Sequence, residues 1–252
     1  MRKIALITGA TSGIGKATAM ILASNDFDVL ITGRREERLK QTAEEIRNQT
    51  GAGVMELCFD VCSKDQVEKT LDSLPDRWKK IDLLINNAGL AVGLGPVHEG
   101  LTDDWDRMID TNVKGLLYVT RKVSAGMAER KRGHIINLSS IAGKEPYSNG
   151  AAYCASKHAV QAITRAQRIE LLPYGIKVSS ICSGMVETEF SLVRFKGDQQ
   201  KADNVYKGLT PLYAEDIAET ILFMVTRPEH VNIDDILIMP TAQGSARDFN
   251  RR

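Results

Sequence analysis

Short β-rich apolar runs alternate with longer helical patterns along almost the whole chain, and this alternation restricts the fold more than any other feature. We expect strands at residues 3–8, 28–32, 54–60, 81–86, 133–138, 176–181 and 235–239. Helical patterns lie between them, at residues 14–23, 36–49, 64–74, 102–130, 151–172 and 214–225. Strands that alternate with helices form β–α–β units, whose helices cover both faces of a parallel sheet. The sequence therefore predicts an α/β fold, a doubly wound parallel sheet of about seven strands.

The length and charge of the chain restrict its class. Its 252 residues suit one α/β domain, so we expect a single domain over residues 1–252. The 33 basic and 32 acidic side chains give a net charge of +1, which offers no excess for binding nucleic acid or a membrane surface. The irregular segment at residues 184–212, with glycines and charges of both signs, is expected to be a lid.

The cysteines and the N-terminus bear on location. Cys58, Cys62, Cys154 and Cys182 form no Cys-x-x-Cys pair. We therefore expect no metal site and no disulfide framework, and a reducing cytoplasmic location. The apolar run at residues 4–7 is too short for the core of a signal peptide, and no uncharged run is suited to spanning a membrane.

The first expected strand runs into a glycine-rich turn, Thr8–Gly15, with the sequence TGATSGIG. Glycine permits a close approach of the backbone to a phosphate, and the helix that follows offers free N–H groups and the positive end of its dipole. The spacing differs from the usual G-x-G-x-x-G fingerprint, and such a turn also occurs for purely structural reasons. Its position between the first strand and the first helix favours binding of a dinucleotide pyrophosphate.

Two arginines follow the second expected strand, where an NAD-preferring site would carry an acidic residue for the ribose 2′-hydroxyl. Arg34 and Arg35 could instead form bidentate hydrogen bonds with a 2′-phosphate. The alternative is an exposed basic helix start, although the helix dipole disfavours cations in a first turn. The pair therefore favours NADP over NAD as the cofactor.

Tyr153 and Lys157 lie four residues apart in the helical pattern at residues 151–172, so they share a helix face. Ser140 comes just after an expected strand, at the edge where open α/β sheets bind ligands. A nearby ammonium group favours the phenolate form of a tyrosine, which could then exchange a proton with a substrate hydroxyl held by Ser140. A half-buried tyrosine beside a lysine that extends to water is the structural alternative.

Four further stretches accompany the glycine-rich turn: NNAG at residues 86–89, Asn112, NLSSIAG at 137–143 and YCASK at 153–157. Together they resemble the motifs of the short-chain dehydrogenase/reductase family, from about residue 3 to about residue 240. Three more stretches, DTNVKGL at 110–116, VRFKGD at 193–198 and HVNI at 230–233, are similar to its NADP-dependent 3-hydroxy acid dehydrogenase branch. That branch oxidises short acids such as serine, allo-threonine and 3-hydroxyisobutyrate.

The resemblance implies a Rossmann-like fold, NADP as cofactor and a homotetramer. It implies a catalytic tetrad of Asn112, Ser140, Tyr153 and Lys157, in which Asn112 connects Lys157 to solvent through a water. The family usually carries proline where Ser183 stands, so we expect a looser loop here. Besides Tyr153 and Lys157, the residues implied to hold the cofactor are Gly9, Thr11, Ser12, Gly13, Ile14, Arg34, Arg35, Asp60, Val61, Asn87, Gly184, Val186 and Thr188.

Four more residues are candidates for contacting the substrate. Arg194 and Lys196, in the expected lid, could bind a carboxylate, and they could equally be exposed charges. Glu145 and Tyr147 follow Ser140 and could border the pocket. Glu145 could pair with a substrate ammonium group or face water.

Three functions remain open at this point. The leading hypothesis is an oxidoreductase that transfers a hydride between NADP(H) and a short 3-hydroxy acid or a similar small alcohol, with Tyr153 as general acid or base. The second is a carbonyl or 3-oxoacyl reductase for a bulkier substrate. A non-catalytic NADP-sensing regulatory protein is a remote third, which the complete tetrad disfavours.

Overall fold

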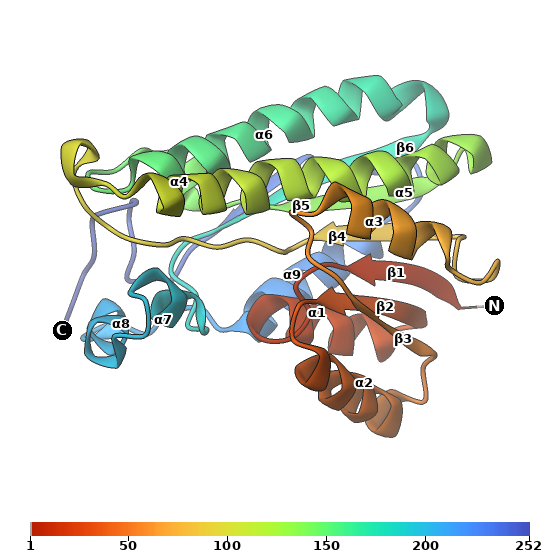
Figure 1. Cartoon of the computed structure of the whole chain (residues 1–252), viewed down its shortest axis with the longest axis horizontal. Helices are drawn as coiled ribbons and strands as arrows, with labels where there is room; N and C mark the ends of the chain where they lie inside the picture. The colour runs from red at the N-terminus through yellow and green to blue at the C-terminus, as the bar shows by residue number, and fades with distance from the viewer. Residues whose placement is uncertain (1) are drawn as a thin grey trace.

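The computed structural model describes residues 2–252 of the chain, which are built around one parallel sheet (Figure 1). Within this range the seven strands stand in the order β3-β2-β1-β4-β5-β6-β7, and every neighbouring pair is parallel. The predicted doubly wound sheet is confirmed. The strands are β1 (Lys3–Ile7), β2 (Phe27–Gly33), β3 (Val54–Cys58), β4 (Leu83–Asn86), β5 (Gly133–Leu138), β6 (Ile176–Ser183) and β7 (Asp235–Ile238).

Helices connect the strands and cover both faces of the sheet. In Figure 1, α1, α2 and α9 lie on one side of the strands, and α4, α5 and α6 lie on the other. The helices are α1 (Gly13–Ala23), α2 (Glu36–Thr50), α3 (Lys64–Asp72), α4 (Thr102–Ile109), α5 (Leu116–Arg130), α6 (Ala151–Leu171), α7 (Phe190–Arg194), α8 (Gln199–Tyr206) and α9 (Ala214–Val225).

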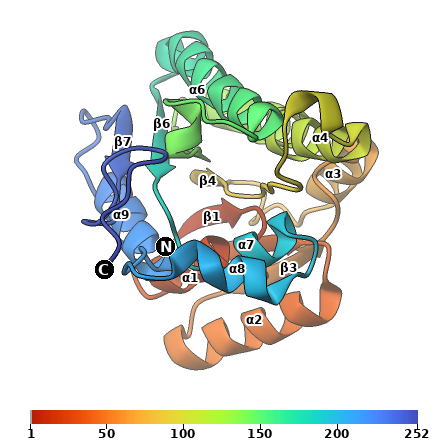
Figure 2. The same ribbon diagram turned by 90° about the vertical axis from the view of Figure 1, so that its left-hand side faces the viewer.

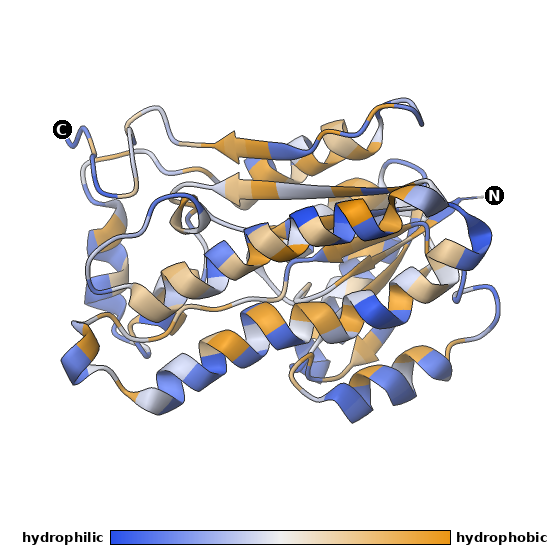
Figure 3. Ribbon diagram, turned by 90° about the horizontal axis from the view of Figure 1, so that it is seen from above, coloured by the Kyte–Doolittle hydropathy of each residue, from blue (hydrophilic) through white to orange (hydrophobic). Residues whose placement is uncertain are grey.

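The central strands are apolar on both faces, as the alternation of strands and helices predicts. In β1, Ala5 and Ile7 pack into the core beneath α1, α2 and α9, whereas Ile4 and Leu6 pack into the core beneath α3 and α5. Successive side chains of a strand point to opposite faces, so each strand contributes to both cores. Figure 3 shows largely apolar strands beside helices that carry both apolar and polar residues.

A buried polar network fixes α6 against the sheet. The amide of Asn86, at the end of β4, donates to Asn137 of β5 and to Thr120 of α5, each at 2.8 Å. The amide of Asn137 in turn donates to Thr164 (2.9 Å) and Gln167 (3.0 Å) of α6. Buried amides are costly without partners, so these bonds restrict where α6 can lie on the sheet.

Two predicted segments differ from the structure. The chain is helical throughout residues 102–130, as predicted, but a π-helix, η2 (Asp110–Gly115), lies between α4 and α5. Such turns are rare and often lie at functional sites, and this one contains the buried Asn112. The segment 184–212, predicted to be irregular, contains the short helices α7 and α8.

The strands end together at one edge of the sheet. Figure 2 looks onto this edge, where α7 and α8 lie in front of β1. The chain order switches between β1 and β4, and sheets of this kind bind ligands at the carboxyl ends beside the switch point. The fold thus brings the turn after β1, Asn87 after β4 and Ser140 after β5 to the same edge.

Candidate active site

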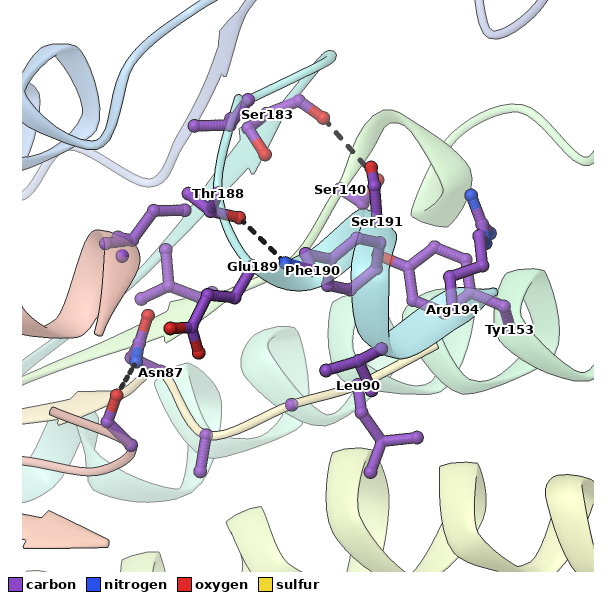
Figure 4. A pocket seen from close by; sticks show the side chains of 18 of the residues that line it. Asn87, Leu90, Ser140, Tyr153, Ser183, Thr188, Glu189, Phe190, Ser191 and Arg194 are labelled. Atoms are coloured by element: carbon purple, nitrogen blue, oxygen red, sulfur yellow. Dashed lines mark hydrogen bonds between the residues drawn. The ribbon is translucent and has the colours of Figure 1, made fainter. Parts of the chain in front are cut away.

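A cavity of about 580 Å³ opens at the carboxyl edge of the sheet, a size typical of sites for small molecules and cofactors. Figure 4 shows side chains from the strand ends, from α6 and from α7 lining it. The predicted site residues that line the cavity are Gly9, Thr11, Ser12, Gly13, Ile14, Arg34, Arg35, Asp60, Val61, Asn87, Ser140, Tyr147, Tyr153, Lys157, Gly184, Val186, Thr188 and Arg194.

The glycine-rich turn begins the cavity. Gly9 and Gly13 have φ values of +68° and +51°, which glycine adopts without the strain that a side chain would cause. The amide of Asn87 donates to the carbonyl oxygens of Thr8 (2.8 Å) and Gly9 (3.1 Å), so it holds the turn against the end of β4. Ser12, Gly13 and Ile14 at the N-terminus of α1 line the cavity, and the first N–H groups of a helix are donors that suit a phosphate.

Arg34 and Arg35, which the sequence predicted, lie on this side of the cavity, and Arg38 is a third arginine nearby. Arg35 donates to Thr11 Oγ1 (2.7 Å) and Ser12 Oγ (3.0 Å), and Arg34 lies 3.6 Å from Asp60 Oδ2.

Glu189 accepts hydrogen bonds from two of the arginines. Arg35 donates to it at 3.0 Å, and Arg38 donates at 2.6 and 2.9 Å. Partial burial works against its ionisation, but the bonds from Arg35 and Arg38 outweigh this and hold the pKa of Glu189 below its ordinary value. All three side chains are nearly half exposed, so each ion pair contributes only about 0.2–1 kcal/mol.

Ser140, Tyr153 and Lys157 come together at the other part of the cavity. Lys157 Nζ donates to the carbonyl of Leu138 at the end of β5 (2.9 Å) and lies 6.0 Å from the centre of the Tyr153 ring. The Ser140 hydroxyl accepts from the N–H of Ala142 (3.1 Å) and donates to the carbonyl of Ser183 (3.5 Å; Figure 4). The predicted sharing of one helix face by Tyr153 and Lys157 is thus observed.

Burial changes the acidity of both groups. It raises the pKa of Tyr153 well above its ordinary value, against the opposing effects of the Arg194 charge and the Ser140 hydroxyl group. Burial also lowers the pKa of Lys157 to about 8. Most Lys157 side chains therefore stay protonated at neutral pH, and a positive charge stands near the tyrosine.

Asn112 lies behind the cavity and does not line it. Its carboxamide accepts from the N–H of Leu90 (2.8 Å) and donates to the carbonyl of Leu90 (2.9 Å) and to Ser156 Oγ (2.9 Å). Gly89 lies between Asn112 and Lys157, because a Cβ atom there would stand 3.2 Å from Asn112 Oδ1 and 3.5 Å from Lys157 Nζ. The water-mediated proton route through Asn112 stays a prediction.

Arg194, from α7, extends over the catalytic candidates. Its guanidinium lies 5.1 Å from the ring centre of Tyr153 and 5.6 Å from that of Phe190, and it donates to the hydroxyl of Tyr147. Figure 4 shows it beside Tyr153. Its buried Nε atom has no hydrogen-bond partner within residues 2–252. An unpaired donor of this kind is costly, and a ligand with acceptor oxygens would satisfy it.

Two predicted substrate residues are not brought to the cavity. Lys196 pairs with Asp104 of α4 (2.8 Å) and does not line the cavity. Glu145 accepts from the N–H of Ala246 (2.9 Å), which ties it to the C-terminal segment. The sequence could not exclude either role, because Asp104 and the N–H of Ala246 each lie about a hundred residues away from their partner in the chain.

Four further residues near the site are not predicted by the sequence: Arg38, Glu189, Phe190 and Gln243. The side-chain oxygen of Gln243 accepts from the N–H of Met185 (2.8 Å), and the N–H of Gly184 donates to the carbonyl oxygen of Ile238 (2.8 Å). The loop that was expected to be looser at Ser183 is therefore held by hydrogen bonds. No sequence pattern marks these residues, since single charged or polar side chains in loops are ordinary.

Comparison with known proteins agrees with this geometry. The family model for the short chain dehydrogenase matches residues 3–198. This chain belongs to that family. It is 45% identical to an NADP-dependent 3-hydroxy acid dehydrogenase of Salmonella typhi, over 96% of this chain and 97% of that protein. It is 42% identical to a serine 3-dehydrogenase of Agrobacterium fabrum, over 96% and 95%.

Solved structures of family members show the same architecture. The closed form of a serine dehydrogenase complexed with NADP+ superimposes with a TM-score of 0.92 at 42% identity, covering 99% of both chains. A serine dehydrogenase from Escherichia coli gives a TM-score of 0.81 at 37% identity, over 96% of this chain and 99% of that one. Among residues 2–252, no helix is both long and apolar enough to cross a membrane.

Buried Lys157 makes the stability of this family member depend on pH. Below about pH 8 the lysine is protonated in both the folded and the unfolded chain, so burial of its charge lowers the free energy of unfolding by its full amount. Between about pH 8 and 10.5 the folded chain loses the proton first, so the free energy of unfolding rises with pH. Lys157→Met removes this dependence. Its stability relative to the wild type should fall by about 3 kcal/mol across this range, measured by urea unfolding.

The matched control is Lys80→Met, which removes an exposed lysine. Its stability relative to the wild type should not change with pH over the same range. Parallel curves for Lys157→Met and the wild type would show that Lys157 does not titrate in this window.

Proposed function

We propose that the chain is an NADP-dependent dehydrogenase that oxidises short 3-hydroxy acids or similar small alcohols. One observation carries the proposal: a single cavity joins the glycine-rich turn and Arg35 at one part to Ser140, Tyr153 and Lys157 at another. The names of the relatives support it, since one is an NADP-dependent 3-hydroxy acid dehydrogenase and another a serine 3-dehydrogenase.

The donor set at the turn fits NADP. Gly9 and Gly13 allow the backbone to approach a pyrophosphate, and the N-terminus of α1 supplies N–H donors. Arg34 and Arg35, which line the cavity beside Thr11, supply the fixed fork of donors that a 2′-phosphate requires. When bound, NADP⁺ supplies the acceptor for a hydride.

The proton chemistry belongs to three side chains of the cavity. Ser140 holds the substrate oxygen by a hydrogen bond, and Tyr153 Oη accepts the proton of the hydroxyl group as the carbonyl forms. The phenolate needs a positive neighbour, because burial alone raises the pKa of Tyr153. Lys157 and Arg194 provide that charge, at 6.0 and 5.1 Å from the ring centre.

Arg194 supports an acid as the substrate. Its guanidinium stands over Tyr153, and its buried Nε atom has no partner among the described residues 2–252. A 3-hydroxy acid carries its carboxylate close to the carbon that is oxidised, so the carboxylate and hydroxyl group can meet Arg194 and Tyr153 together. We also propose that residues 184–212 act as the lid that brings Arg194 over the substrate.

The direct test is the absorbance of NADPH with purified protein and NADP⁺. L-serine, L-allo-threonine, 3-hydroxyisobutyrate and 3-hydroxypropionate are offered in parallel, with NAD⁺ as the control cofactor. We expect NADP⁺-dependent turnover of at least one acid. Tyr153→Phe should lower kcat by at least about 100-fold, because it removes the proton acceptor. Calorimetry should show that this variant still binds NADP⁺.

Tyr213→Phe is the matched control, since Tyr213 is exposed before α9, and it should keep wild-type turnover. If the protein oxidises NADPH in the presence of ketones but turns over none of the acids, the proposed hydride transfer stands and the small acid is rejected as the substrate. Near-normal kcat in Tyr153→Phe would contradict the role of this tyrosine.

Arg194→Gln tests the carboxylate contact. The change should lower kcat/KM for 3-hydroxyisobutyrate by roughly 10- to 100-fold, since a charge-assisted bond contributes about 1.5–3 kcal/mol. The neutral analogue 2-methyl-1,3-propanediol should lose little, because it has no carboxylate. Lys201→Gln, at an exposed lid lysine, is the control. An equal loss for acid and diol would assign Arg194 to positioning Tyr153 instead.

The homotetramer and the cytoplasmic location stay predictions of the sequence. Two separate groups of exposed apolar side chains support the tetramer, because such assemblies need more than one interface. One group comprises Ile169, Leu172 and Tyr174, and the other Phe223 and Leu237. Light scattering should give the mass of four chains, and Ile169→Glu should reduce it to two. A single-chain mass for the wild type would reject the tetramer.

A further inference from the structure

Glu189 occupies an unusual position for a lid carboxylate. It stands immediately before α7 and accepts from Arg35 at 3.0 Å and from Arg38 at 2.6 and 2.9 Å. Both arginines belong to the start of α2, 154 and 151 residues away in the chain. In Figure 4 the Glu189 carboxylate points to the Asn87 side of the cavity, away from Arg194 and Tyr153.

The same arginine serves the phosphate end of the cavity. The other terminal nitrogen of Arg35 donates to Thr11 Oγ1 and Ser12 Oγ in the glycine-rich turn. Glu189, Arg35, Thr11 and Ser12 all line one cavity. The Glu189 carboxylate is therefore an anion already placed on Arg35, one of the two arginines that the proposed function assigns to the 2′-phosphate, and it also engages Arg38.

A phosphate and a carboxylate compete unequally for such donors. A phosphate monoester carries about −1.5 to −2 charges at pH 7 and three acceptor oxygens, whereas a carboxylate carries one charge and two. The ion pairs of Glu189 are nearly half exposed, so they are weak. A 2′-phosphate can thus displace Glu189 from Arg35, and the two anions would repel one another if both stayed.

We propose that Glu189 determines cofactor specificity by competing with the 2′-phosphate for Arg35 and Arg38, and that its displacement releases the start of the lid. The inference rests on the proposed use of NADP. A cofactor without the 2′-phosphate has no group to replace Glu189 and leaves it in place. Glu189 is therefore a specificity residue that sets how tightly the 2′-phosphate is held.

The release affects one end of the lid only. Beyond α7, Lys196 pairs with the buried Asp104, and the N–H of Gly93 donates to the carbonyl of Arg194 (3.0 Å). These contacts to α4 and to the strand-end loop do not involve the arginines of α2. Displacement of Glu189 therefore loosens α7 at its first residues while Arg194 stays anchored over Tyr153.

The test uses two probes that lack the nicotinamide. Adenosine 2′,5′-bisphosphate carries the 2′-phosphate, and 5′-AMP does not. Their affinities are measured by calorimetry for the full wild-type chain and for Glu189→Gln. We expect the variant to bind the bisphosphate about three- to tenfold more tightly, because two competing ion pairs are lost, and 5′-AMP with unchanged affinity.

Glu187→Gln is the matched control, since it removes the same charge from an exposed residue of the same segment. It should bind both probes as the wild type does. Hydrogen–deuterium exchange adds a second measurement: the bisphosphate should speed exchange at the amides of α7 in the wild type, whereas 5′-AMP should not. Slower or unchanged exchange there would overturn the release of the lid.

The affinities separate failure of this inference from failure of the proposed function. If the wild type prefers the bisphosphate but Glu189→Gln binds it no more tightly, the competition by Glu189 is wrong and the use of NADP stands. If the wild type binds the two probes equally, the proposed NADP specificity is wrong, and the inference about Glu189 is overturned with it.

Discussion

Burial of both faces of the parallel sheet is the constraint on which the rest of this molecule depends. The central strands pack toward α1, α2 and α9 on one side and toward α3 and α5 on the other. A strand that is covered on both faces presents polar groups mainly where it ends. The ends of β1, β4, β5 and β6 therefore carry the glycine-rich turn, Asn87, Ser140 and the Ser183 loop at one edge.

The site places ionisable groups where burial opposes their charge. Lys157 is held between the end of β5 and α6, and its burial shifts its pKa to about 8. Tyr153 is driven toward its neutral form by the same desolvation. Burying a lysine beside a tyrosine lowers the stability of the fold. Ionisable groups in such costly positions are concentrated at functional sites. Arg194 adds a second positive charge from a segment that is itself weakly packed.

The segment at residues 184–212, which we propose as a lid, is held mainly by charge and hydrogen bonds. Among the described residues of its two short helices, only Ser191 and Ala202 are buried. Its first half is instead tied by Glu189 to α2 and by Lys196 to α4. Segments with few buried apolar contacts open at little cost, so this arrangement suits a segment that must admit and release ligands.

The sequence by itself determined the sheet, the glycine-rich turn, the arginines after β2 and the shared helix face of Tyr153 and Lys157. Each of these follows from local pattern: alternation of apolar runs, glycine at a strand–helix junction, or spacing of four residues. Only the tertiary structure decided that Lys196 and Glu145 are engaged elsewhere, that residues 110–115 form a π-helix, and that Glu189 reaches α2. These depend on partners distant in sequence, which no local pattern can specify.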